Sequence, residues 1–303
     1  MKEKIIYDNH EDHWDDCLND EEANKKALTW LQQENTLDRW RHSRIYSLVE
    51  PIINFKNTFK WLTIGDGRFG TDANALLSLG ADEVVCTDIS DKLLKIGHEA
   101  GFIKNYAIEN AEFLSFNEGE FDFVFCKEAY HHFPRPHIAL HEMLRVCDVG
   151  VILVEPNDSR IDHRILNRLL PLIKKFLGKK GNSNMHNFEP VGNYIFSISK
   201  RELEKIQLGM HRRFIAYNFI NDYYESGFEF IFLNSQKNTD RIKIIKTKLL
   251  ISMRDILTRL GLITPGLLVS ILFKSEPNKA LLADLTASGW TVKELPHNPY
   301  LKD

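Results

Sequence analysis

Short runs of apolar residues alternate with amphipathic segments between residues 59 and 156. Each run ends in polar or glycine residues, and in the segments between runs apolar residues recur every three or four positions. This alternation predicts βαβ units and a parallel sheet. We therefore expect an α/β fold with a Rossmann-like, doubly wound sheet. The expected strands are FKWLTI, DEVVCTDI, KNYAIEN, FDFVFCKE and GVILVEP, and the expected helices are TDANALLSLG, SDKLLKIGHEAG and PHIALHEMLRV.

The pattern changes on both sides of this region. Residues 12–50 show helical periodicity, with apolar side chains on one side. After Pro156 the alternation gives way to a basic apolar segment, RILNRLLPLIKKFLGKK, and then to NYIFSISKRELEKI, which predicts a strand and a helix with a capping box formed by Ser199 and Glu202. The chain is therefore predicted to contain a helical cap over 1–50, a core over 51–157, a substrate cover over 158–245, and C-terminal strands and a helix over 246–303 that complete the core.

Composition and charge narrow the classes of partner. The 303 residues are 43% hydrophobic and 27% charged, which is typical of a globular protein. A net charge of -3 gives no overall field for a polyanion, so we expect no nucleic-acid partner. The four cysteines form no C-x-x-C pair, which favours reduced thiols and a cytoplasmic location. The apolar stretch 260–273 contains Pro265 and Gly266 and is shorter than the ~20 residues of a membrane helix, so we expect no membrane span.

The sequence GDGRFG, residues 65–70, matches G-x-G-x-x-G, and Asp88 follows at the distance expected for a dinucleotide-binding fingerprint. Its glycines permit a sharp turn and the close approach of a ligand to the next helix. NAD would place a pyrophosphate on this loop, whereas S-adenosylmethionine would place there a zwitterionic methionine tail and a sulfonium. The carboxylate of Asp66 would repel the first and attract the second. Asp88 suits a ribose diol in either cofactor, so the choice of S-adenosylmethionine rests on Asp66.

Residues 61–157 resemble the class I S-adenosylmethionine-dependent methyltransferases, in particular their small-molecule, type 11-like branch. Five ordered segments carry the resemblance: WLTIGDGRFG, VVCTDIS, IENAEFLSF, EFDFVFCKEAYHHF and HEMLRVCDVGVILVEP. Thr63 stands where these enzymes usually have an acid, and Phe69 stands at the usual third glycine, with Gly70 one place later. The resemblance implies a Rossmann-like core and S-adenosylmethionine as the cofactor.

Carried over position by position, the resemblance also implies cofactor contacts. Asp88 is implied to bind the ribose hydroxyls and Ile89 to cover the adenine. Asn110 and Ala111 stand where an Asp-Ala pair commonly meets the adenine edge. The full set of expected cofactor-binding residues is Gly65, Asp66, Gly67, Gly70, Asp88, Ile89, Asn110, Ala111 and Lys127.

Candidates for the chemistry cluster in KEAYHHFPRPH. Methyl transfer to a hydroxyl needs a base, and histidine titrates near neutrality, so His131 and His132 are the first candidates. A structural role for both histidines is the alternative. Glu128 and Glu155 are the next candidates, each at an expected strand end. The resemblance implies that Lys127 and Glu128 face the donor methyl.

Two further patterns bear on metal binding and on the charge of the substrate. His137 and His141 share a helix face, but the segment lacks the glutamate of H-E-x-x-H and any cysteine ligand, so we predict no metal. The basic residues after Arg160 form either a solvated helix face or a mouth that attracts an anionic substrate. The stretch RWRHSRIY, residues 39–46, is a candidate substrate-cover element or packing between cap and core.

The sequence thus predicts methyl transfer from S-adenosylmethionine to a small molecule, anionic if the basic segment forms such a mouth, most readily at a hydroxyl oxygen. Two alternatives stay open at this point: an NAD(P)-dependent oxidoreductase that uses residues 65–70, and a non-catalytic cofactor-binding module. An oxidoreductase would be expected to show a second run of βαβ units after residue 156.

Overall fold

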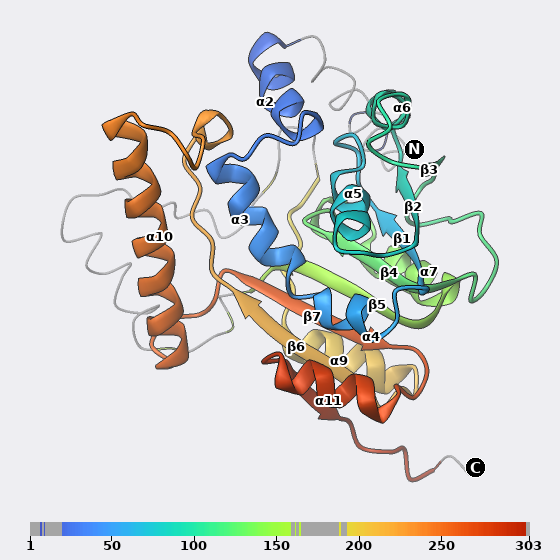
Figure 1. Cartoon of the computed structure of the whole chain (residues 1–303). Helices are drawn as coiled ribbons and strands as arrows, with labels where there is room; N and C mark the ends of the chain where they lie inside the picture. Colours follow the sequence, from blue (N-terminus) through green and yellow to red (C-terminus); the bar gives the residue numbers. More distant parts are fainter. Residues whose placement is uncertain are drawn as a thin grey trace.

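An eight-stranded mixed sheet organises the computed structural model, which describes residues 7, 9, 20–158, 161, 164, 188 and 193–300 (Figure 1). The strand order is β3-β2-β1-β4-β5-β7-β6-β8. Strands β1 to β5 pair in parallel, whereas the β5–β7, β6–β7 and β6–β8 pairs are antiparallel. The strands are β1 Lys60–Ile64, β2 Glu83–Asp88, β3 Asn105–Ile108, β4 Phe121–Lys127, β5 Cys147–Pro156, β6 Phe214–Ile220, β7 Leu267–Phe273 and β8 Thr291–Glu294.

Helices cover both faces of the sheet, which confirms the predicted α/β, doubly wound class. Alternate side chains of each strand point to opposite faces, so Trp61 and Phe123 belong to one core cluster while Leu62 and Val124 belong to the other. The first cluster packs against α4, α5, α6 and α11, and the second against α7 and α9. These helices are α4 Glu50–Phe55, α5 Thr71–Ser78, α6 Lys92–Glu99, α7 Pro136–Val146, α9 Lys200–Gly209 and α11 Lys279–Ala287.

The direction in which successive strands are added to the sheet changes at β1. The chain runs outward from β1 through β2 to β3, and then crosses back to β4 and β5 on the other side. The carboxyl ends of β1 and β4 are neighbours, because Ile64 is paired with Cys126. A doubly wound sheet opens a crevice at this kind of switch point. The fold therefore places the loops after β1 and β4 side by side at the edge where a ligand would bind.

A third group of helices stands beyond this edge of the sheet (Figure 1). It contains α2 Glu21–Leu31, α3 Leu37–Tyr46, the 3-10 turn η2 Phe228–Phe230 and α10 Asn238–Arg259. Leu37, Phe228, Ile231 and Ile244 form its small core. The N-terminal helices α2 and α3 therefore pack with a segment that lies about two hundred residues later in the chain, a partnership that short-range periodicity does not reveal.

Some local predictions differ from the structure. NYIFSIS forms no strand; Tyr194 and Ile198 make only isolated bridges, to Phe188 and Asn157. The helix after it begins as predicted, because the Ser199 side chain accepts from the Glu202 amide at 3.2 Å. Strand β6 and helix α10 were not predicted. Strand β6 pairs inside the sheet although it falls in the range expected to form the cover, and the division into four units stays a prediction.

Much of the basic segment lies outside the described residues, as does the first part of the expected helical range 12–50. Of the basic residues singled out after Pro156, the structure describes Arg164. Its guanidinium donates to the carbonyl oxygen of Ile263 at 2.6 Å and to that of Thr258 at 3.3 Å. This side chain therefore bonds the end of α10 and the turn after it.

Candidate functional site

The glycine loop is shaped by close packing at two of its glycines. A Cβ at Gly67 would lie 2.8 Å from Oδ2 of Asp88, so a side chain there would displace the carboxylate at the end of β2. Gly70 adopts a φ of +77° at the N-cap of α5, where a Cβ would lie 2.6 Å from Ile103. Only glycine takes up this backbone without strain. Gly67 thus brings the loop against Asp88, whereas Gly70 shapes the turn from a position that lines neither cavity described below.

Asp66 is buried, and its carboxylate is bound by the strand and the helix that flank its loop. Oδ1 accepts from the Asp72 amide at 2.9 Å, and Oδ2 accepts from the Ala73 amide at 2.8 Å and from the Thr63 hydroxyl at 2.9 Å. Burial, with the nearby charge of Asp72, raises the pKa of Asp66 well above its ordinary 3.8. The carboxylate therefore caps the first turn of α5. This differs from the free, ligand-facing charge on which the sequence argument depended.

Thr63 explains why this arrangement is stable. It stands where the resemblance leads one to expect an acid, and its hydroxyl instead supplies a hydrogen bond to Asp66. An acid at both positions would place two carboxylates within hydrogen-bond distance of each other, which is unfavourable in a buried site. The departure from the family pattern at Thr63 and the acid at Asp66 therefore compensate for each other.

A small cavity of about 110 Å³ lies at the carboxyl ends of β2 and β3. It brings together most residues expected to hold the adenosine half of the cofactor: Gly65, Asp88, Ile89, Asn110 and Ala111. Burial raises the pKa of Asp88 to about 6, and backbone amides, including that of Ser90 at 3.0 Å, favour its ionised form. The cavity thus combines one buried carboxylate with apolar walls, the chemistry that a ribose diol and an adenine ring require.

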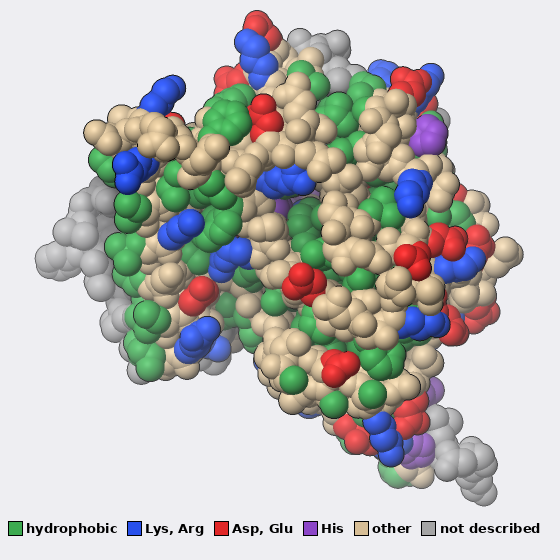
Figure 2. All heavy atoms as spheres, viewed as in Figure 1, with side chains coloured by type: hydrophobic (Ala, Val, Ile, Leu, Met, Phe, Trp, Pro, Cys, Tyr) green, Lys and Arg blue, Asp and Glu red, His purple; other side chains and the backbone are tan. Residues whose placement is uncertain are grey.

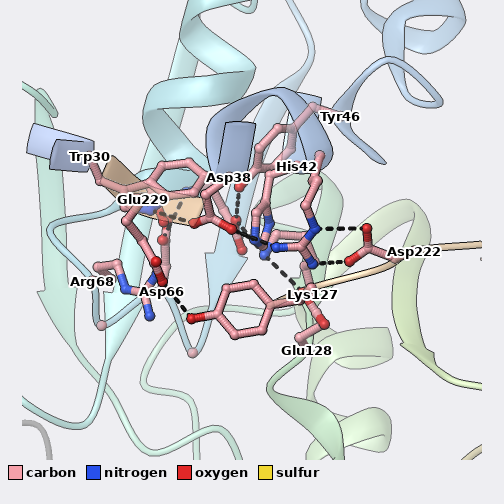
Figure 3. A pocket seen from close by; sticks show the side chains of 16 residues that line it. Trp30, Asp38, His42, Tyr46, Asp66, Arg68, Lys127, Glu128, Asp222 and Glu229 are labelled. Carbon is pink, nitrogen blue, oxygen red and sulfur yellow. Dashed lines mark hydrogen bonds and ion pairs between the residues drawn. The ribbon is translucent and has the colours of Figure 1, made fainter. Parts of the chain in front are cut away.

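A larger cavity of about 570 Å³ adjoins the first, since Gly65 and Glu128 line both. Figure 3 shows side chains from separate parts of the chain pointing into it, and Figure 2 shows a recess on the same side of the molecule. The lining comes from α2 and α3, the glycine loop, the end of β4 and the segment after β6: Trp30, Asp38, Arg41, His42, Tyr46, Gly65, Asp66, Gly67, Arg68, Thr71, Asp72, Lys127, Glu128, Asp222, Tyr224 and Glu229.

Lys127 connects β4 to α5 across the floor of this cavity. Its ammonium lies 3.3 Å from Oδ1 of Asp72 and 3.6 Å from Oε2 of Glu128. Burial alone would lower the pKa of Lys127, but the two carboxylates raise it, so the side chain stays charged. The hydroxyl of Tyr46 donates to the same Asp72 oxygen at 2.6 Å. Lys127 thus lines the larger cavity and joins β4 to α5, and its expected contact with the cofactor stays a prediction.

Arg41 closes the opposite wall by joining α3 to the segment after β6. Its guanidinium donates to Asp38 at 2.5 Å and holds Asp222 through two nitrogens, with the Nε contact at 2.9 Å. Both Arg41 and Asp38 are buried. Because a guanidinium fork matches a carboxylate in a fixed geometry, this contact sets the position of the cap relative to the sheet.

Glu128 occupies the boundary between the two cavities. It follows β4 directly and has a φ of +52°, a left-handed conformation that is uncommon for a residue with a side chain. Its amide donates to the carbonyl oxygen of Val154 at 2.8 Å, which holds the backbone in place. Strained residues of this kind gather at functional sites, where they aim a side chain. Of the four candidate bases named from the sequence, Glu128 alone lines the larger cavity.

The two histidines lie elsewhere. His131 is buried and lines neither cavity; its Nδ1 lies 2.5 Å from Oε2 of Glu155. Glu155 is fully buried and its other oxygen accepts from the Ala129 and Tyr130 amides at 3.1 and 2.9 Å. His132 lines the small cavity, on the side of the expected adenosine, and its ring lies 3.9 Å from that of His131. The structure thus separates both histidines from the larger cavity.

His42 is a cavity residue that the sequence did not single out as a base. It lies on α3 against Trp30, at a ring distance of 4.9 Å. Burial, together with the charges of Lys127 and Arg41, lowers the pKa of His42 well below 6.5, so the imidazole is neutral near pH 7. His42, Arg41 and Tyr46 belong to the stretch 39–46, the candidate substrate-cover element, and all three line this cavity. Asp38, Asp222 and Glu229 were not expected there, because only the fold brings their segments together.

The described residues contain neither a metal-binding cluster nor a membrane-spanning helix. Among them, no group of three or more His, Cys, Asp or Glu side chains is arranged to hold a metal ion. His137 instead lies 3.6 Å from Glu202 on α9. Over the same ranges, the structure contains no helix that is both long and apolar enough to span a membrane.

Comparisons with known proteins agree with the sequence resemblance. Residues 62–154 match the family model described as a methyltransferase domain. No protein of curated function matches the sequence. Similar solved structures include a possible histamine N-methyltransferase of Thermotoga maritima, at 15% identity and a TM-score of 0.43, covering 78% of this chain and 94% of that one.

Two further solved structures are similar at the same level. A methyltransferase of Methanosarcina mazei is 21% identical, with a TM-score of 0.42, covering 75% of this chain and 98% of that one. The magnesium protoporphyrin IX methyltransferase of Synechocystis, with bound SAH, is 14% identical, with a TM-score of 0.45, covering 91% of this chain and all of that one.

Proposed function

We propose that this chain, whose residues 62–154 form a class I S-adenosylmethionine-dependent methyltransferase domain, methylates a hydroxyl oxygen of a small molecule. The family match confirms the predicted enzyme class and its cofactor, S-adenosylmethionine. The observation that carries the finer proposal is the position of Glu128, a carboxylate on the boundary between a cavity suited to adenosine and a larger polar cavity.

The residues around the small cavity fit the cofactor. Asp88 offers a buried carboxylate for the ribose hydroxyls, and Ile89 and Ala111 offer apolar walls for the adenine. Arg68 lines the larger cavity, and within the described residues it forms no ion pair, so we assign it to the methionine carboxylate. When bound, S-adenosylmethionine supplies a methyl group on a sulfonium, which is transferred to the acceptor oxygen as the carbon–sulfur bond breaks.

In this proposal the chain aligns the acceptor and removes one proton. The acceptor hydroxyl lies in the larger cavity, and its proton passes to the Glu128 carboxylate as the oxygen–carbon bond forms. Lys127, 3.6 Å from Glu128, holds the carboxylate in position. Alignment supplies much of the rate of such a displacement, and a base contributes typically 10²- to 10⁴-fold more. His42 is the second candidate base, because it is neutral and lines the same cavity.

The lining also bears on the kind of acceptor. It contains six Asp or Glu side chains and three cationic side chains, so acids outnumber cations. Arg41 is paired with Asp38 and Asp222, and Lys127 with Asp72 and Glu128. Three aromatic rings, of Trp30, Tyr46 and Tyr224, complete it. Carboxylates accept hydrogen bonds from hydroxyl groups, and aromatic faces pack against C–H groups. We therefore infer a polyhydroxylated or aminated acceptor in place of the anionic one that the basic segment permitted.

The oxidoreductase and binding-module alternatives have less support. After β5 the described chain adds antiparallel strands β6, β7 and β8, whereas a dinucleotide enzyme would be expected to add a second set of βαβ units. A binding module without catalytic activity would not need an acid such as Glu128 on a strained backbone between two cavities. The buried free thiols of Cys86, Cys126 and Cys147 support the proposal of a reducing, cytoplasmic location.

The test is transfer of radiolabelled methyl from S-adenosylmethionine to a panel of polyols, sugars and amino sugars by the full chain, with products identified by mass spectrometry. We expect labelled methyl ethers and their loss in Glu128→Gln. Glu99→Gln, an exposed position at the end of α6, is the matched control. Transfer to nitrogen alone, with Glu128→Gln fully active, would contradict the proposed O-methylation.

A further inference from the structure

Helix α10 carries an exposed apolar stripe along its outer side. Six large hydrophobic side chains follow one another at spacings of three and four residues, and each is between 48% and 68% exposed: Ile242, Ile245, Leu249, Met253, Ile256 and Leu260. At 3.6 residues per turn this spacing keeps them on one face of the helix. Figure 2 shows hydrophobic side chains along the edge of the molecule formed by α10.

The opposite face of α10 holds the helix to the rest of the molecule. Ile244, Thr247 and Ile251 are buried there, and Ile244 belongs to the small core shared with α3 and η2. On the sheet side, Asn221 donates to Asp255 at 2.9 Å, and Arg254 donates to the carbonyl oxygen of Asp222 at 2.6 Å. The apolar stripe is therefore a second face, additional to the one that folding buries.

Both flanks of the stripe are basic. By helical position, Arg241, Lys248 and Arg259 lie along one side, and Lys246 lies on the other, with Lys243 further round; all five are exposed. Lys246 has a salt bridge with Glu225 at 2.7 Å, and Lys248 lies over the ring of Trp40. The helix carries six Lys or Arg and two Asp, and Asp255 lies on the sheet side, 3.6 Å from Arg44.

This charge pattern decides between the occupants that could cover the stripe. If two copies paired through it, Lys and Arg would face Lys and Arg in either helix direction, because both flanks are basic, and like charges at close range are unfavourable. A nucleic acid would contact the basic flanks but leave the apolar stripe in water. An anionic bilayer surface offers acyl chains to the stripe and negative headgroups to the flanks.

We propose that α10 is a docking surface for anionic lipid membranes, on which the helix lies in the plane of the interface with its apolar stripe inserted. Docking of this kind requires no membrane-spanning helix. It also places the larger cavity near the bilayer, because Asp222, which lines that cavity, is bonded to α10 through Arg254. If the proposed methyl transfer holds, the enzyme meets acceptors carried by or dissolved near the membrane.

The experiment measures binding of the full chain to vesicles by co-sedimentation. We expect binding to vesicles with about one-quarter phosphatidylglycerol, much weaker binding to pure phosphatidylcholine, and a loss with rising salt. Removing Arg241, Lys248 and Arg259 as Gln should weaken binding to the anionic vesicles by roughly 100-fold, at about fivefold for each charge.

A second variant tests the stripe itself. Ile245→Asn/Leu249→Asn/Ile256→Asn should reduce binding at least about tenfold, while circular dichroism reports an unchanged helix content and melting temperature. Ile138→Asn, which changes an exposed apolar residue on α7, is the matched control and should bind as the parent does. Three results would overturn the proposal: no binding to anionic vesicles, equal binding to both vesicle types, or a dimer in sedimentation equilibrium that the stripe variant dissociates. None of these readouts needs methyl transfer, so the proposed function is tested separately.

Discussion

At the scale of single residues, burial and hydrogen bonding give different properties to three acidic side chains of the site that the sequence alone does not distinguish. Asp66 is held by three donors from β1 and α5. Asp88, whose pKa is raised by burial, faces the small cavity, and Glu128, on a strained backbone, lines both cavities. Their roles differ because their surroundings differ: a helix cap, a ribose-binding acid and a candidate base.

The first prediction concerns the base. Glu128→Gln removes the proton acceptor but keeps the shape of the side chain, so we expect a 10²- to 10⁴-fold loss of turnover with little change in cofactor affinity. His132→Ala should change cofactor affinity more than turnover, because this ring lines the small cavity. Single-turnover rates and calorimetry of the two variants separate these effects. Full activity in Glu128→Gln together with an inactive His42→Ala would transfer the role to His42.

The second prediction concerns pH. Burial raises the pKa of Asp88 to about 6, and the ionised form is the one that accepts hydrogen bonds from a ribose diol. The group loses its charge as the pH falls through 6, so affinity for S-adenosylhomocysteine should be intact at pH 7 and about tenfold weaker at pH 5. Calorimetry between pH 5 and 8 measures this.

Asp88→Asn is the control for that profile. The variant should bind more weakly at pH 7 and show a flat dependence between pH 5 and 7. A profile that keeps its slope in the variant would assign the titration to His132, which lines the same cavity.

At the scale of elements, the buried contact between Arg41, Asp38 and Asp222 joins α3 to the segment after β6. Arg41→Met would leave two carboxylates without their cation, one of them fully enclosed, and we expect a loss of about 3 kcal/mol in the free energy of unfolding. Urea denaturation measures this loss.

A surface pair provides the comparison. Lys25 and Glu21 on α2 are 62% and 85% exposed, so Lys25→Met should cost under about 1 kcal/mol. Equal effects of the two substitutions would show that the Arg41 contact does not hold the cap to the sheet.

Prediction from sequence succeeded where the information is local. Strands β1 to β5 and the helices between them follow from the alternation of apolar runs. The start of α9 follows from Ser199 and Glu202, which lie three residues apart and form its N-terminal cap. The segment NYIFSIS has the composition of a strand but lacks a partner that pairs along its length. Strand β6 was missed because its identity as a strand depends on β7 and β8, which lie far along the chain.

The residues of the site fall into the same two groups: those that local sequence predicts and those that only the fold brings together. Gly65, Asp88, Ile89, Asn110, Ala111 and Lys127 line the cavities at strand ends, where a doubly wound sheet places its ligand. Arg41, His42 and Asp222 reach the same cavity only because α3 packs against the segment after β6, which no motif encodes. Asp66 was expected to select S-adenosylmethionine by its charge, and the family match supports that cofactor, but the side chain bonds to the strand and helix that flank its loop.

At the scale of the whole molecule, a methyltransferase core carries a cap formed by α2 and α3 with the segment around η2, and a basic apolar helix, α10, lies on one edge. We propose that the two adjoining cavities hold S-adenosylmethionine and an acceptor. The most direct test is a calorimetric titration of the full chain with S-adenosylhomocysteine and, separately, with NADH. We expect saturable binding of S-adenosylhomocysteine at one site per chain and no heat from NADH at the same concentration. Saturable binding of NADH with none of S-adenosylhomocysteine would contradict it.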